Sequence, residues 1–431
     1  LDHSQPASEF AIASDANASD SMSHLPESIR ATDGYALWFG LQDLQLLESV
    51  LSTSSLHIVC VDSNAKKVAD ARKRFDSQGI YGERITAHQG IVESFQAPPY
   101  IASLVVLERS IAERMLEAGT LSQVYESVRP YGGTLWIPGS DSTSTPLVQQ
   151  IANTDLSNAN ISTEHNGVVI TRVGALPDSA PWTHAYGDVA NTVKSNDSRV
   201  KLPLGILWFG GNSNLDVLPR HGHGPSEQVI GGRLFIEGMS SLLARDVYTG
   251  RVLWKREFND LGNYQVYYDE TYADTPFSTS YNQVHLPGAN ARGTNYVATS
   301  DGVYLVIDDR CLLLDCATGE TLHEFVLPAT DLGPQPEWGY VGVYENLLLA
   351  GVNFGNYTTR ELFTFTPEAK KGPAWNPDHS SSLGLMAFDR KTGEVLWQVD
   401  AKHGFLHNGI VAGGGRIYLL DKLPKRVEEQ S

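Results

Sequence analysis

The segment Ala244–Trp254 reads ARDVYTGRVLW, and two later segments repeat its pattern: Leu314–Leu322 reads LDCATGETL, and Ala387–Trp397 reads AFDRKTGEVLW. Each copy has an apolar run, an Asp, a Thr-Gly pair and a second apolar run. The Asp and Thr side chains can accept backbone amide hydrogens within a turn, and Gly adopts the positive φ that such a turn needs. Each copy therefore predicts a β-hairpin with one face toward a core, and the three copies together predict a repeat architecture.

The pattern resembles the A-x-D-x-x-T-G-x-x-x-W repeat of pyrroloquinoline-quinone-type (PQQ-like) β-propellers, in which the Trp of one blade packs against its neighbour. The second copy departs from it, because His323 follows Leu322 where a Trp is expected nearby. The segment Gly413–Asp421 begins a fourth blade, by its similarity to Gly231–Ile236. Propellers close with about 4–8 blades. The resemblance therefore implies a partial PQQ-like β-propeller over residues 176–431, completed by further sequence or by a partner chain.

The N-terminal half follows a different pattern. Residues 1–30 are rich in Ser, Asp and Ala with little periodicity, and predict a flexible segment. Over residues 31–175, apolar runs alternate with amphipathic stretches, which predicts an α/β domain with βαβ units and a parallel sheet. The predicted strands are Tyr35–Phe39, His57–Val61, Arg84–Ala87, Ile101–Leu107 and Gly133–Ile137, and the predicted helices cover 43–51, 65–75 and 116–128. The pair Asn166-Gly167, between two further apolar runs, predicts a closing hairpin.

A doubly wound, Rossmann-like sheet that ends in a hairpin resembles the class I S-adenosylmethionine-dependent methyltransferases. In those enzymes a Gly-rich first loop lets the backbone approach the cofactor, and an acidic residue that ends the second strand binds the ribose hydroxyls. The resemblance implies cofactor contacts at Gly40, Asp43, Asp62 and His88. Asp62 matches the acidic position, whereas Gln42 and Leu44 stand where a G-x-G-x-G loop has glycine. Because side chains there would crowd the cofactor, the sequence favours a degenerate methyltransferase-like domain over an active one.

The order of the two parts resembles planctomycete-type fusion proteins in which a methyltransferase-like domain interrupts or precedes a PQQ-like propeller. The first hypothesis is a binding or scaffolding protein that recognises a protein or polymer on its propeller face. The alternatives are an active methyltransferase whose propeller positions the substrate, and a quinoprotein oxidoreductase. Pyrroloquinoline quinone is disfavoured, since the sequence has no adjacent Cys pair, unlike the alcohol dehydrogenases of that group. The propeller resemblance implies a periplasmic or extracellular location and leaves the cytoplasm open.

Two closely spaced histidines form a candidate metal site. His221 and His223 lie two residues apart, so on an extended segment both side chains point the same way and can share a metal. A metal there needs a further ligand from the fold, which makes a polar surface loop the favoured interpretation.

The 32 basic and 50 acidic residues give a formal charge of −18. This charge disfavours a general affinity for nucleic acid or anionic lipid. The sequence also predicts no transmembrane segment, since no stretch approaches the ~20 apolar residues of a membrane span.

Overall fold

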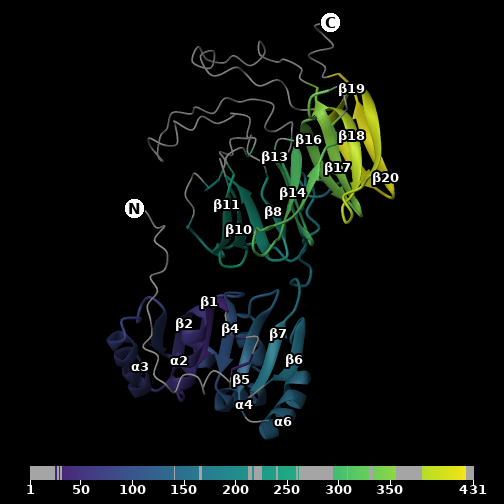
Figure 1. Cartoon of the computed structure of the whole chain (residues 1–431). Helices are drawn as coiled ribbons and strands as arrows, with labels where there is room; N and C mark the ends of the chain where they lie inside the picture. Colours follow the sequence, from purple (N-terminus) through teal and green to yellow (C-terminus); the bar gives the residue numbers. More distant parts are fainter. Residues whose placement is uncertain are drawn as a thin grey trace. The chain divides into compact units, whose positions relative to one another are not determined.

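The computed structural model describes residues 25–26, 29, 32–139, 141–164, 167–211, 216–217, 226–238, 241–258, 261, 295–307, 309–329, 333–355 and 381–423. The chain divides into two compact units, Leu1–Pro177 and Asp178–Ser431 (Figure 1).

The N-terminal unit is built on a seven-stranded sheet with the strand order β3-β2-β1-β4-β5-β7-β6 (Figure 1). Its strands are β1 (Asp33–Phe39), β2 (Ser55–Asp62), β3 (Ile85–Gln89), β4 (Ala102–Leu107), β5 (Gly133–Pro138), β6 (Ala159–Glu164) and β7 (Gly167–Arg172). Strands β1 to β5 are parallel, and β7 lies antiparallel between β5 and β6. The predicted doubly wound sheet with a closing hairpin is confirmed. The strand order reverses between β1 and β4, which places the ligand crevice of such folds at the carboxyl ends of these strands.

Helices cover both faces of this sheet. One core contains apolar side chains of α2 (Leu44–Thr53) and α3 (Ala65–Ser77). The other core contains those of α4 (Arg109–Glu117), α5 (Leu121–Tyr125) and α6 (Asp141–Ala152). Alternation along β1 divides its side chains, with Trp38 in the first core and Leu37 and Phe39 in the second. Leu25 and Ile29 are each 1% exposed in the first core, so the packed unit includes residues of the segment predicted to be flexible.

The helix predicted over residues 116–128 is wrong in its bounds. Helix α4 already begins at Arg109, and α5 is a separate short helix. Between them Gly119 has a φ of 66°, which breaks the helical path and which Gly adopts without steric cost. Helix α6, which the sequence analysis did not predict, buries Leu147 and Ile151 in the second core. A short 3-10 helix, η2 (Val92–Ser94), precedes β4.

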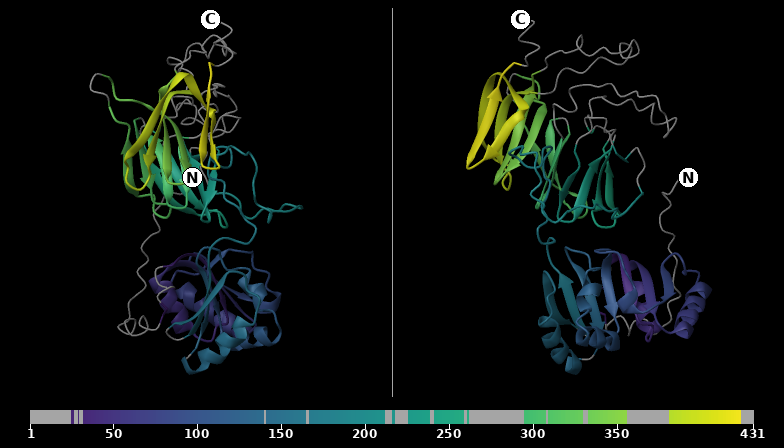
Figure 2. Two further views of the ribbon diagram at one scale, coloured as in Figure 1. Left: turned by 90° about the vertical axis from the view of Figure 1, so that its right-hand side faces the viewer. Right: turned by 180° about the vertical axis from the view of Figure 1, so that it is seen from behind.

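The C-terminal unit contains, within its described residues, three antiparallel sheets that stand side by side (Figure 2). The first has β8 (Gln228–Ile230), β9 (Arg233–Glu237), β10 (Ser241–Asp246) and β11 (Val252–Glu257). The second has β12 (Tyr296–Thr299), β13 (Gly302–Ile307), β14 (Arg310–Leu314) and β15 (Thr321–Val326). The third has β16 (Trp338–Tyr344), β17 (Leu347–Phe354), β18 (Ser381–Asp389), β19 (Val395–Gly413) and β20 (Arg416–Asp421). These sheets are the predicted propeller-like blades.

The repeated hairpins form the same turn three times. The carboxylate Oδ1 of Asp246 accepts from the amides of Tyr248 and Thr249 at 2.8 and 3.1 Å. Asp315 and Asp389 accept from the two equivalent amides at 2.8 to 3.0 Å. The amide hydrogen bonds to Thr318 and Thr392 hold the pKa values of Asp315 and Asp389 below their ordinary range. The glycines of these turns have φ values of 69°, 74° and 77°. The Thr hydroxyls accept from the amides of Arg251, Glu320 and Glu394 at 3.2 to 3.4 Å. The predicted roles of Asp, Thr and Gly in the turn are therefore confirmed.

Aromatic rings connect each turn to the strand before it. The Trp254 indole on β11 lies against Gly319 in the turn of the second sheet, and its Nε1 donates to the carbonyl of Cys316 at 3.0 Å. Trp208 lies against Gly250 in the same way and donates to the carbonyl of Val247 at 2.9 Å. A side chain on either glycine would overlap the ring. The aromatic ring of one blade therefore packs on the bare glycine of the next.

His323 performs this role between the second and third sheets. Its ring lies against the glycine of the third turn, with Nε2 3.0 Å from the position a Cβ on Gly393 would take. His323 pairs with Leu313, as Trp254 pairs with Ala244, so it stands at the Trp position of the repeat itself. The second copy of the repeat therefore has the smaller imidazole ring of His323 where the other copies have an indole.

A single segment ties the first strands of the sheets together. Trp182 exchanges both backbone hydrogen bonds with Val229 of β8, at 2.9 and 2.8 Å. The Thr183 carbonyl accepts from Ala298 of β12 at 3.2 Å, and His184 Nε2 accepts from the Val343 amide of β16 at 3.2 Å. Further along, the Val189 carbonyl accepts from Ala412 of β19 at 3.0 Å. The segment 182–189 therefore crosses the inner strands of successive blades.

Candidate cofactor site

The carboxyl ends of β1, β2 and β4 meet where the strand order of the N-terminal sheet reverses. β1 ends at Phe39, and Gly40 turns the chain with a φ of 101°. The Gly40 amide donates to the Val61 carbonyl at 2.9 Å, so the first loop starts against β2. Gly is required at this φ, which matches the one glycine of the predicted loop pattern that the sequence retains.

Asp62, the last residue of β2, fastens the first loop to the sheet. Its side chain is only 8% exposed. Oδ2 accepts from the Leu41 amide at 2.8 Å, and Oδ1 accepts from the Asn64 amide at 2.7 Å. The Lys67 ammonium lies 3.7 Å from Oδ2. The structure thus brings together two predicted site residues, Gly40 and Asp62, but both carboxylate oxygens of Asp62 already accept backbone amides of this chain.

Glu108 is a site residue that the sequence analysis missed. It directly follows β4, and its amide donates to the Phe39 carbonyl at 3.0 Å. Its side chain reaches the first loop, where Oε1 accepts from the Gln42 amide at 2.5 Å. A Cβ on Gly40 would lie 2.0 Å from Glu108 Cδ. The Glu108 side chain therefore takes up the space that the absent side chain of Gly40 leaves open.

Three carboxylates, those of Asp43, Asp62 and Glu108, influence one another at these strand ends. Burial raises the pKa of Glu108, and the neighbouring carboxylates of Asp62 and Asp43 add to this rise. The Gln42 amide and the Lys67 ammonium act in the opposite direction. Because a negative charge is disfavoured there, an anionic ligand group gains nothing from entering beside these side chains.

Asp43 and His88 have other surroundings than the resemblance implies. Asp43 is the N-cap of α2, where its Oδ1 accepts from the Leu46 amide at 2.9 Å. This is the ordinary capping role of an Asp at a helix start. His88 lies on β3 beside Val61, and its side chain is exposed. In the part of the chain that the structure describes, neither side chain contacts Asp62 or Gly40 through a hydrogen bond.

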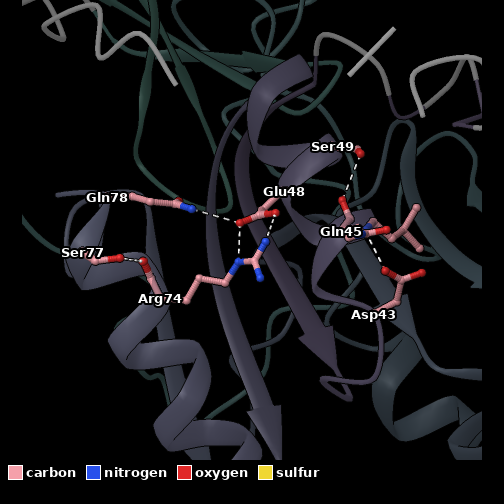
Figure 3. A network of polar contacts seen from close by, with 8 residues as sticks. Asp43, Gln45, Glu48, Ser49, Arg74, Ser77 and Gln78 are labelled. Atoms are coloured by element: carbon pink, nitrogen blue, oxygen red, sulfur yellow. Dashed lines mark hydrogen bonds and ion pairs between the residues drawn. The ribbon is translucent and has the colours of Figure 1, made fainter. Parts of the chain in front are cut away.

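Polar contacts fix the two helices that follow β1 and β2 (Figure 3). Arg74 of α3 holds Glu48 of α2 with two hydrogen bonds of 2.6 Å, and Gln78 adds a third of 3.0 Å. Although burial acts to raise it, these hydrogen bonds hold the pKa of Glu48 below its ordinary value. The bidentate pair sets the spacing of α2 and α3 and therefore supports the loop that precedes α2.

The predicted metal ligands His221 and His223 lie outside the described residues. Among the residues that are described, no group of three His, Cys, Asp or Glu side chains is placed to hold a metal ion. No helix within the described ranges is long and apolar enough to cross a membrane.

No protein-family model matches this chain, and no curated protein matches it either. Solved structures similar to the N-terminal region include two that are named as S-adenosylmethionine-dependent methyltransferases. One, from Methanococcus maripaludis, is 15% identical over 35% of this chain and 81% of its own, with a TM-score of 0.29. The other, from Aquifex aeolicus, is 11% identical over 36% of this chain and 93% of its own, with a TM-score of 0.28.

The C-terminal region is similar to a different group. The quinohemoprotein alcohol dehydrogenase from Comamonas testosteroni is 16% identical over 52% of this chain, with a TM-score of 0.32. The match covers 28% of that enzyme, so this chain spans less than a third of its length. The strand order and the repeated turns carry the fold assignment. The chain joins an α/β unit with a Rossmann-like, methyltransferase-type sheet to propeller-like antiparallel sheets.

Proposed function

We propose that this chain is a binding or scaffolding protein in which a degenerate methyltransferase-like domain is joined to PQQ-like blades. The observation that carries the proposal is the Glu108 side chain on the bare backbone of Gly40. In the methyltransferase-like arrangement, a ligand approaches the backbone of the first loop where glycine leaves room for it. Here the chain's own carboxylate uses that room, which supports a degenerate cofactor site.

The hydrogen bonds of Asp62 support the same proposal. A carboxylate has about four acceptor sites, and ribose hydroxyls must compete for them with any amide already bound. Both Asp62 oxygens accept amides of Leu41 and Asn64, and Lys67 lies beside one of them. Asp62 therefore acts here as a structural anchor of the first loop.

The blades support a binding role rather than quinone chemistry. Segment 182–189 hydrogen-bonds to the first strands of the sheets, and buried His184 is one of its contacts. These strands line the axis in a propeller, where a quinone ligand would have to enter. The partner we propose for the outer propeller face is a protein or polymer.

Ligand-induced stabilisation of the full chain tests the proposal. A ligand that binds only the folded state raises the free energy of unfolding by about 2.7 kcal/mol at one hundred times its Kd. We expect 1 mM S-adenosylmethionine or S-adenosylhomocysteine to leave the unfolding midpoint of the N-terminal unit unchanged. A clear rise that Glu108→Gln does not alter would contradict the proposed role of Glu108.

An active methyltransferase is the second candidate, and the position of Asp62 favours it. Asp62 ends β2 beside the first loop, where the ribose of the cofactor would lie. Methyl transfer from labelled S-adenosylmethionine to any added acceptor, lost in Asp62→Ala, would replace the binding proposal by this one.

A further inference from the structure

An arm of the C-terminal unit, residues 199–209, precedes the first blade. Its first end is held at Ser198, whose amide donates to the Asp178 carbonyl at 2.9 Å. Its second end is held at Gly210, whose carbonyl accepts from Arg245 Nη2 at 3.4 Å. The structure describes the arm throughout and shows neither helix nor strand in it. In the left view of Figure 2 this loop stands away from the sheets. The arm is therefore fixed at its base and open along its length.

The apolar side chains of the arm lie in water. Those with the greatest exposure, 69 to 95%, are Val200, Leu202, Leu204, Ile206 and Phe209. Outside the arm, the exposed large apolar side chains of the described residues reach at most 67%, at Val193. Such residues normally occur singly on a protein surface, whereas a contiguous group marks an interaction site. The arm therefore presents a concentrated apolar surface for contact.

The arm is also basic, although the chain is acidic. Arg199 and Lys201 alternate with its first apolar residues, and no Asp or Glu occurs from Ser198 to Leu215. Both basic side chains are exposed. The formal charge of −18 disfavours a general affinity for anionic lipid. Any attraction to a negatively charged surface is therefore confined to a segment such as this one.

Two features of the arm disfavour the addition of a strand from another protein. Pro203 has no amide hydrogen for a ladder, and Gly205 weakens a strand interior. Ile206 and Leu207 are apolar and adjacent, so in an extended chain their side chains point to opposite faces. A bilayer interface receives apolar side chains from every side of a loop, because the hydrophobic effect has no direction. The arm therefore fits a lipid surface better than it fits a sheet edge.

We propose that residues 199–209 form a lipid-binding loop that enters the interface of an anionic phospholipid bilayer. The apolar side chains leave water for the boundary between headgroups and acyl chains. Arg199 and Lys201 stay at the level of the headgroups, where their long stems let the charged ends reach lipid phosphates. Because no helix or strand satisfies the backbone of the arm, the loop enters only the region that water still reaches.

This inference goes beyond the proposed binding role, because it assigns a lipid surface to residues outside the blades. It involves only residues of the C-terminal unit. A failure of lipid binding would therefore leave the cofactor experiment unaffected, and cofactor binding would say nothing about the arm.

Flotation of the full chain with lipid vesicles tests the proposal. The probes are vesicles of phosphatidylcholine mixed with phosphatidylglycerol, and vesicles of phosphatidylcholine alone. We expect the chain to float with the mixed vesicles and to bind the neutral vesicles about tenfold more weakly. Added salt should weaken binding to the mixed vesicles, because it screens the attraction of Arg199 and Lys201.

A double variant of the arm removes apolar area without touching a packed core. Leu202→Ser combined with Ile206→Ser should weaken vesicle binding at least tenfold, because both side chains are more than 80% exposed and lose their gain from leaving water. The matched control is Leu322→Ser, which removes a 56% exposed apolar side chain from β15 and should bind like the unaltered chain. Unfolding transitions show that both variants are folded.

A pair of charge variants tests the basic part of the arm. Lys201→Glu should weaken binding to the mixed vesicles and leave binding to the neutral vesicles unchanged. Lys391→Glu, at an exposed position of the third turn, is the matched control and should change neither.

Three results would overturn the proposal. The first is a chain that stays unbound at millimolar mixed lipid, and the second is equal flotation of the Leu202→Ser, Ile206→Ser variant. The third is a dimer in the absence of vesicles that this double variant abolishes, since it would assign the arm to a second copy of the chain. Equal flotation with both kinds of vesicle would contradict the assigned anionic surface.

Discussion

Gly319 shows how strictly a single residue is constrained between two blades. Its φ is 74°, and an added Cβ would lie 2.7 Å from the Trp254 ring. A side chain there meets both backbone strain and overlap with a ring whose Nε1 is already hydrogen-bonded.

We therefore expect Gly319→Val to lower the free energy of unfolding of the C-terminal unit by about 2–5 kcal/mol. Chemical denaturation followed by tryptophan fluorescence measures this change. Gly413→Ala is the matched control, because nothing lies within 4 Å of an added Cβ at that position. Equal destabilisation by the two substitutions would show that the contact with Trp254 has no special importance.

His184 links stability to pH. It is 7% exposed, and its Nε2 accepts a hydrogen bond from the Val343 amide, which requires the neutral ring. Burial lowers the pKa of His184 from 6.5 to about 4, against the opposing effect of Asp188. Between these values the unfolded chain binds a proton that the folded chain does not, so the free energy of unfolding falls as pH falls.

We expect His184 to lower the free energy of unfolding of the C-terminal unit by about 3 kcal/mol between pH 7 and pH 4. Denaturation midpoints across this range measure it. His184→Gln should flatten that part of the profile, whereas His57→Gln, at an exposed position of the N-terminal unit, should leave it in place. A profile unchanged by His184→Gln would refute the link.

At the scale of elements, the repeated turn holds its hairpin through one carboxylate. Asp246 is 1% exposed and accepts from two amides of the turn. We expect Asp246→Ala to destabilise the C-terminal unit by about 1–3 kcal/mol, because two backbone donors lose their acceptor. Asp246→Asn keeps an oxygen in place and should lose less. If both variants unfold alike in a denaturant titration, the turn does not depend on these hydrogen bonds.

The turns could be predicted from sequence because all their interactions are local. Asp246 and Gly250 lie within five residues of each other, and each acts on backbone within that stretch. The strands of the N-terminal sheet were predictable for the same reason, since alternation of buried side chains is a local pattern. The bounds of α4 and α5 could not be predicted in this way. Glu108 and Gly119 mark these bounds, and neither residue interrupts the pattern of apolar residues.

The candidate site was predictable only in part. Gly40 and Asp62 follow apolar strands, and parallel strands place their ends at one edge. Glu108 was missed because its contact with Gln42 joins residues 66 positions apart, which no local pattern reports. The signal available was its place directly after the fourth apolar run. His323 stands four residues after Gly319, as Trp254 stands four after Gly250, so the spacing of the repeat already places it at the Trp position, and strand pairing agrees.

At the scale of the molecule, each unit has its own cores and its own chemistry. The candidate cofactor residues Gly40, Asp62 and Glu108 all lie in the N-terminal unit. The turn glycines that contact Trp208 and Trp254 all lie in the C-terminal unit. The candidate cofactor site and the repeated turns therefore belong to separate units and can be tested separately.

Calorimetric titration of S-adenosylmethionine and S-adenosylhomocysteine into the full chain, beside Asp62→Ala, tests the central claim most directly. We predict no binding by the folded chain, because Glu108 and Asp62 engage the first loop themselves. Binding at micromolar Kd, roughly −8 kcal/mol, that disappears in a folded Asp62→Ala variant would contradict this account and establish a working cofactor site.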